Sequence, residues 1–161
     1  MKTFSKFMAL AMIATGFLMS FTSCGSDDDN DQPANPAAKS VAGSYTGDMS
    51  CSVMGQTSTF EDVTFTVTAV DDATVSIAVS DFGEPPMKVE GFTMTGVKVS
   101  GSEGTYELAA TEYNGTTAAG KAYSGTVRGN YANGILNVDF QLKYGAMPMP
   151  MICTFNAPKN Q

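Results

Sequence analysis

From residue 40 onward, apolar and polar residues alternate along the chain. A period of two is typical of strands with one buried and one wet face. Five runs are clear, at residues 41–53, 62–68, 74–80, 123–131 and 136–144. Weaker runs span about 88–99 and 104–113, and a last run spans about 149–157. The pattern predicts eight strands and no amphipathic helix.

Turn residues separate these runs. Asn133-Gly134 lies between two clear strands, and this pair supplies the positive φ values that a type I′ hairpin turn requires. Other reversals are expected at Gly55-Gln56, Asp71-Asp72, Gly101-Ser102 and Asn114-Gly115, with a longer loop at 81–86. Short strands joined by tight turns predict an all-β, antiparallel up-and-down meander. Such a meander closes into a barrel or folds into a sandwich.

Two cysteines bear on the choice between barrel and sandwich. Cys51 lies on the first predicted strand and Cys153 on the last, each on the apolar face. In a closed eight-stranded meander the first and last strands are neighbours, so a possible disulfide between these residues would close the barrel. Two buried free thiols are the alternative, because cysteine is often buried.

The start of the chain has the features of an export signal. Lys2 and Lys6 precede an apolar stretch that ends just before Cys24, and a run of aspartates follows. The stretch is shorter than the roughly 20 residues of a membrane span. We interpret Cys24 as a lipidated cysteine; an ordinary signal peptide with an incidental cysteine is the alternative. The expected divisions are a lipoprotein signal peptide at 1–23, a flexible acidic and Pro-Ala tether at 24–39, and a folded domain at 40–158.

Charge and composition exclude several function classes. The formal net charge is −7, which disfavours a nucleic-acid partner, since such proteins gather Lys and Arg. The chain has no His, which excludes Ser-His-Asp and Cys-His catalysis, and its cysteines lack zinc-site spacing. We therefore expect no enzyme activity, no catalytic residue, no metal site and no cofactor.

Three segments carry a resemblance to a known family. The residues Val41–Gly47, Ser52–Gly55 and Met147–Met151 resemble, by order and spacing, the calycin-like β-barrel lipoproteins of Bacteroidetes-type bacteria. The resemblance implies an eight-stranded calycin or lipocalin-like barrel. Ser26–Asp29 is similar to the acidic export signal of surface lipoproteins in that group, which implies a lipid-anchored protein exposed at the outer membrane. Gly43-Ser44-Tyr45 departs from the Gly-x-Trp motif of true lipocalins.

An eight-stranded barrel either is filled by side chains or holds one small ligand. Inward glycines, at 43, 47, 125 and 129, favour a cavity, although they serve barrel coiling and bulges equally well. The expected ligand-binding residues are Tyr45, Met49, Phe65, Tyr123, Tyr131 and Phe140, with a rim at 82–86 and 147–151.

The resulting hypothesis is a protein attached to the membrane through its lipid, which binds a small apolar or amphipathic ligand or a peptide in the barrel. The alternative is a filled barrel that acts as an interaction module for a partner protein. Met147, Met149 and Met151 fit a core or pocket wall, since Met side chains fill irregular spaces, and less well a Cu(I) site.

Overall fold

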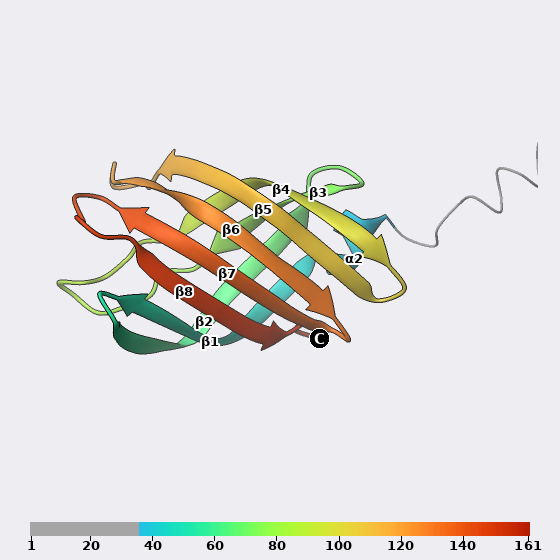
Figure 1. The fold of residues 1–161 in the computed structure, drawn as a ribbon, viewed down its shortest axis with the longest axis horizontal. Coiled ribbons are helices and arrows are strands. Elements are labelled where there is room, and N and C mark those ends of the chain that lie inside the picture. The colour runs from blue at the N-terminus through green and yellow to red at the C-terminus, as the bar shows by residue number, and fades with distance from the viewer. Residues whose placement is uncertain (1–35) are drawn as a thin grey trace, which may run out of the picture. The chain divides into compact units, whose positions relative to one another are not determined.

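The computed structural model describes residues 36–161, so the predicted signal peptide at 1–23 and the predicted lipidation of Cys24 lie outside the described residues. Eight antiparallel strands form a closed barrel, in which each strand pairs with the next and β8 returns to β1 (Figure 1). The strands are β1 (Gly43–Val53), β2 (Gln56–Ala69), β3 (Thr74–Val79), β4 (Phe92–Ser102), β5 (Thr105–Thr116), β6 (Ala122–Ala132), β7 (Ile135–Tyr144) and β8 (Met151–Pro158). The predicted all-β, up-and-down barrel is confirmed, and the sandwich alternative is wrong.

One short helix, α2 (Ala37–Val41), precedes the barrel, in a region where the sequence pattern predicted none. Ala38 is fully buried and its backbone N–H donates to the carbonyl of Asp72, 3.1 Å away in the β2–β3 turn. Residues 36–39 therefore pack with the barrel, although they were expected to belong to the tether at 24–39. The helix is too short for its apolar spacing to be recognised. No helix within residues 36–161 is long and apolar enough to cross a membrane.

Two of the predicted turns lie where the sequence placed them. Asn133 and Gly134 have φ values of 54° and 81°, as a type I′ hairpin requires. Asp71 lies in the β2–β3 reversal, where its carboxylate accepts a hydrogen bond of 2.8 Å from the Ala73 N–H.

Other turns are displaced along the chain. The β1–β2 reversal centres on Met54-Gly55, and the β4–β5 reversal on Glu103-Gly104, each one or two residues from its predicted place. The predicted turn at Asn114-Gly115 is wrong, because both residues lie inside β5 and pair with β6. A Cβ at Gly115 would overlap the ring of Tyr123, so this glycine makes room for a side chain.

Aromatic side chains fill the barrel. The rings of Phe65 and Phe155 stack with centroids 3.9 Å apart, and the Phe140 ring lies 5.9 Å from that of Phe65. Tyr45 meets Tyr131 edge to face at 6.2 Å. Offset-stacked and edge-to-face pairs are the arrangements that aromatic quadrupoles favour. These rings occupy the space that a deep ligand would need.

The inward glycines serve the backbone and leave no room for a ligand. A Cβ at Gly125 would overlap the carbonyl oxygen of Gln141, and one at Gly129 the carbonyl oxygen of Asn137. Gly47 lies at a shift in the β1–β2 register. Of the two interpretations of these glycines, barrel coiling and bulges is the correct one.

Candidate functional site

The seam that closes the barrel is short and holds a disulfide. Four consecutive residues of β1, Met49 to Ser52, pair with β8, and within this stretch Cys51 lies directly opposite Cys153. The two sulfurs are bonded, and both residues are buried. The bond therefore joins the first and last strands at the end of β1 that leads to the β1–β2 turn.

Beyond this disulfide, the barrel opens into a cavity of about 910 Å³, here called the mouth. The mouth lies at the end of the barrel opposite α2, where the β1–β2 turn, the 80–91 segment and the 145–150 segment meet (Figure 1). Its walls are lined by Cys51, Val53, Met54, Gln56, Ser58, Thr59, Phe60, Phe82, Gly83, Glu84, Met87, Val89, Met147 and Met151. Most of these side chains are apolar, so the mouth suits an apolar surface.

Two aromatic rings form one wall of the mouth. Phe60 from β2 and Phe82 from the 80–91 segment have ring centroids 5.1 Å apart, in a tilted arrangement. Phe82 and Val89 exchange backbone hydrogen bonds of 3.0 Å and 2.9 Å, which fold the segment into a small hairpin. Phe82 and Val89 are buried, and Phe60 is partly buried against the core, so the wall is continuous with the core.

Charged groups fix the base of this hairpin. The Asp81 carboxylate accepts a hydrogen bond of 2.6 Å from the Gly91 N–H and forms an ion pair of 2.9 Å with the Lys88 ammonium. The hydrogen bond from Lys88, followed by that from Gly91, lowers the pKa of the Asp81 carboxyl from its ordinary value. The same contact raises the pKa of Lys88. The hairpin is thus held at a defined place beside the mouth.

Four methionines give the rest of the mouth an adaptable surface, in contrast to the aromatic pair. Met54 and Met87 line the mouth with 81% and 69% of their surface exposed, while Met147 is half-buried and Met151 is buried. Unbranched thioether side chains adjust their shape to different ligands, and exposed ones are found on binding surfaces that accept several partners. The lining therefore combines an aromatic pair with flexible methionine side chains.

The predicted ligand-binding residues lie elsewhere. None of the six lines the mouth, and Tyr45, Met49, Phe65 and Phe140 are buried in the packed core. Burial, and next to it the neighbouring Tyr131, raises the pKa of Tyr45. The Tyr123 hydroxyl is held by the backbone of Thr93, with distances of 3.3 Å to its nitrogen and 3.1 Å to its oxygen.

The predicted rim fits better than the predicted pocket. Both of its segments, 82–86 and 147–151, contribute side chains to the mouth. Three further lining residues were not predicted: Val53 at the end of β1, Phe60 within β2, and Val89 in the 80–91 segment. A methionine beside the Gly55 turn, Met54, is the feature of the sequence that could have pointed to this end of the barrel.

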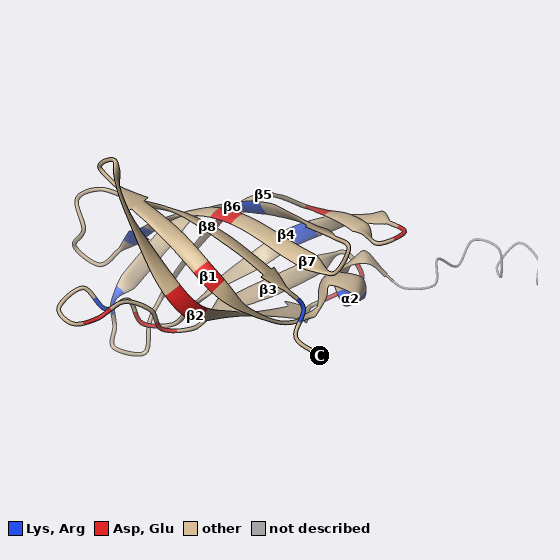
Figure 2. Ribbon diagram, turned by 90° about the horizontal axis from the view of Figure 1, so that it is seen from below, with Lys and Arg blue, Asp and Glu red and all other residues tan. Residues whose placement is uncertain are grey.

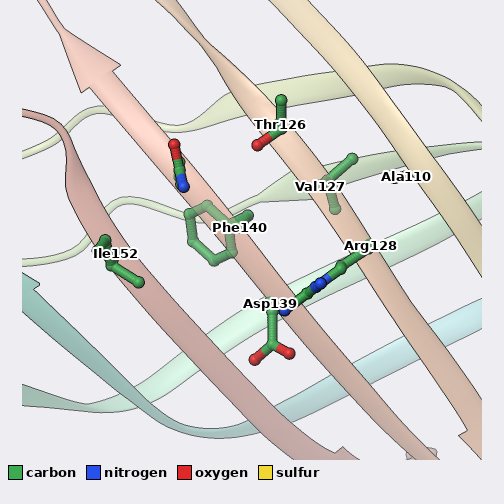
Figure 3. Close-up of a pocket in the computed structure, with 8 residues that line it drawn as sticks. Ala110, Thr126, Val127, Arg128, Asp139, Phe140 and Ile152 are labelled. Atoms are coloured by element: carbon green, nitrogen blue, oxygen red, sulfur yellow. The ribbon is translucent and has the colours of Figure 1, made fainter.

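A second, smaller hollow of about 320 Å³ lies on the outer wall of the barrel (Figure 3). Outward residues of neighbouring strands line it, among them Arg128 and its cross-strand partner Asp139. Asp139 also accepts a hydrogen bond of 3.0 Å from the Thr154 hydroxyl. Phe140 borders this hollow but is itself buried. Because the hollow is a depression between strands, the mouth is the stronger candidate site.

Comparison with known proteins places this barrel in a family. The family model of the calycin-like β-barrel domain matches residues 41–157. The chain belongs to the calycin-like β-barrel domain family. The resemblance predicted from Val41–Gly47, Ser52–Gly55 and Met147–Met151 is therefore confirmed.

A solved structure shares the calycin-like fold. It is the crystal structure of a candidate outer membrane protein from Bacteroides fragilis, which is similar to this chain with 25% sequence identity and a TM-score of 0.69. The match covers 77% of this calycin-like chain and 53% of the other, so it spans about half the length of that protein. No protein with a curated description matches the sequence.

Proposed function

We propose that this calycin-like barrel is a lipid-anchored protein of the cell envelope that binds a small apolar or amphipathic molecule at its mouth. The observation that carries the proposal is a cavity of about 910 Å³ with apolar walls at one end of a filled barrel. Cavities of a few hundred to a thousand Å³, lined mainly by apolar groups, are typical of small-molecule sites. The mouth keeps the two predicted rim segments, and its lining takes the place of the predicted pocket residues inside the barrel.

Three observations support an envelope location. Cys24 follows an apolar leader and precedes an acidic run, as expected for a surface lipoprotein. The Cys51–Cys153 disulfide fits an oxidising compartment. The similar Bacteroides fragilis protein is a candidate outer membrane protein. Within the barrel, the chain enters at α2, away from the mouth, so an N-terminal anchor leaves the mouth loops free.

Methionine methyl groups provide a direct test of this proposal. We expect a chain from residue 25 onward, labelled with [methyl-13C]-methionine, to show chemical-shift changes at Met54, Met87, Met147 and Met151 on addition of dodecan-1-ol. These four side chains line the mouth. Met94 is fully buried in the barrel core and serves as the internal reference. Unchanged mouth methyls up to the solubility limit of the alcohol contradict the proposal.

A pair of variants locates the binding. Ser58 lines the mouth and is the cross-strand partner of Cys51, so its side chain lies on the cavity side of β2. Its neighbour Thr57 pairs with Ser52 and lies on the other face. Ser58→Trp is expected to fill the mouth and abolish the shift changes, whereas Thr57→Trp leaves them intact. Equal effects of the two variants contradict a mouth site.

A second candidate function is an interaction module, and the filled barrel interior favours it. Exposed apolar side chains, Met54, Met87 and Met149, lie around the same end. Native mass spectrometry of the protein isolated from its own bacterium distinguishes the two functions. A retained small molecule supports the first, and a retained protein supports the second.

A further inference from the structure

A second hollow extends the mouth beyond two of its methionines. A further hollow of about 430 Å³ adjoins it and shares two lining residues with it, Met87 and Met147. This side hollow adds two lysines to the lining, Lys88 from the 80–91 segment and Lys121 from the β5–β6 turn. Figure 2 shows both basic and acidic residues among the loops at this end of the barrel, away from α2. The apolar mouth therefore adjoins, at Met87 and Met147, a hollow that is lined by two lysine ammonium groups.

The two lysines differ in how their charge is matched. Lys88 is paired with Asp81, and this is the one ion pair in the part of the chain that the structure describes. The Lys121 ammonium instead lies over the ring of Tyr144, 5.5 Å from its centroid. A cation above an aromatic face is attracted by the ring but keeps its full charge. Lys121 is thus the positive group at the mouth that has no carboxylate bound to it.

The surroundings keep Lys121 in place. Tyr144 is buried, with 3% exposed, and its hydroxyl accepts a hydrogen bond of 3.1 Å from the Glu90 N–H, so the ring is a fixed platform. Gly145 carries no side chain, and a Cβ there would lie 4.0 Å from the Lys121 Cδ, so the lysine stem packs along the turn. Glu84 lines the mouth itself but not the side hollow. Glu84 and Glu90 both act on the Lys88 ammonium, which Asp81 already binds, so Lys121 is the cation expected to receive an anionic group.

From this arrangement we propose that the mouth selects amphipathic molecules with an anionic headgroup, and that Lys121 contacts that headgroup while the apolar body lies against the methionines and Phe60. This inference rests on the proposed function, since it names the ligand class of the same site. The headgroup chemistry is shared by a carboxylate and a phosphate. The chain carries a net charge of −7, so the attraction is local and is expected to weaken with salt.

Three compounds with one chain length test the proposal: dodecanoate, dodecyl phosphate and dodecan-1-ol. We expect the chain from residue 25 onward to bind at least one of the two anions about five-fold more tightly than the alcohol, as measured by the methionine-methyl titration at pH 7.5. Lys121→Gln should remove this preference, so that the affinities for the two anions fall to about that for the alcohol measured on the same variant. Lys143→Gln is the matched control, because Lys143 is exposed nearby but lines neither the mouth nor the side hollow.

The outcomes distinguish failure of the headgroup inference from failure of the proposed function. Binding of all three compounds with equal affinity, or an equal response of the two lysine variants, overturns the headgroup inference but leaves the mouth as an apolar site. Absence of binding by every compound overturns the proposed function as well. A preference for one anion that Lys121→Gln abolishes supports the proposal and identifies the headgroup as carboxylate or phosphate.

Discussion

Reduction of the Cys51–Cys153 disulfide should lower the stability of the barrel substantially. The bond links residues 102 positions apart, so it closes a loop that contains most of the folded domain. In the chain-entropy model, a loop of this length lowers the entropy of the unfolded chain enough to stabilise the fold by about 4.7 kcal/mol. The directly paired register of the two strands brings the cysteines together, so the seam does not need to rearrange to form the bond.

Urea unfolding measures this contribution. With no Trp in the chain, tyrosine fluorescence and far-UV circular dichroism follow the transition. For a typical slope of about 1–3 kcal/mol per molar urea, the full 4.7 kcal/mol lowers the midpoint by at least about 1.5 M. The comparison of oxidised and reduced wild-type protein isolates the bond, because every side-chain atom other than the two thiol hydrogens is the same.

A double variant, Cys51→Ala with Cys153→Ala, completes the experiment. Its midpoint should lie near that of the reduced protein and should not respond to reductant. Equal midpoints for oxidised and reduced wild type would refute the reasoning. In that case the disulfide adds nothing measurable to the closure that the β1–β8 backbone pairs and the packing around Phe155 already provide.

Three further predictions concern packing, the helix and pH. Gly125→Ala should destabilise the fold by about 1–3 kcal/mol in urea unfolding, since the new methyl overlaps the Gln141 carbonyl; an unchanged midpoint contradicts the tight β6–β7 contact. Tyr45→Phe removes the 2.6 Å hydrogen bond that the hydroxyl donates to the Val41 carbonyl, which should cost about 1–3 kcal/mol and speed amide exchange in α2; normal exchange there argues against this anchor. The folded pKa of Asp81 is lowered, so the contribution of this carboxylate to stability is present above the ordinary Asp pKa of about 3.9 and is lost as pH falls through the folded pKa. The NMR signal of the Gly91 amide, which donates to Asp81, should therefore titrate with a midpoint below about 3.9. Asp81→Asn should abolish that titration, and a midpoint at or above about 3.9 refutes the contact.

Much of the fold follows from the sequence because burial in a closed barrel alternates along each strand. In β8, the residues Met151, Cys153, Phe155 and Ala157 are buried and those between them are exposed, which is the pattern the period of two predicted. The same alternation placed Cys51 of the first strand and Cys153 of the last strand on the buried face of the sheet. Each of these inferences uses only local order along the chain.

The candidate site could not be found in that way. Whether the barrel is hollow depends on how rings from distant strands meet, and the stacking of Phe65 on Phe155 is set by strand register. The mouth is built by strand ends and by the 80–91 segment, where alternation stops. The wrong turn prediction at Asn114-Gly115 has the same cause, a contact between strands. Gly115 is required there because the Tyr123 ring of the neighbouring strand occupies the space of a side chain.

The disulfide and the mouth are coupled by a shared residue. Cys51 closes the seam and also lines the mouth, and the neighbouring Met151 on β8 lines it too. Four residue pairs form the continuous β1–β8 pairing here, so few backbone bonds hold this seam of the mouth wall when the disulfide is reduced. The α2 end is held separately, by the Tyr45 hydroxyl and the Asp72 carbonyl. Reduction should therefore weaken ligand binding at the mouth, at urea concentrations where α2 is still protected from exchange. Equal loosening of both ends would show instead that the barrel responds as one unit.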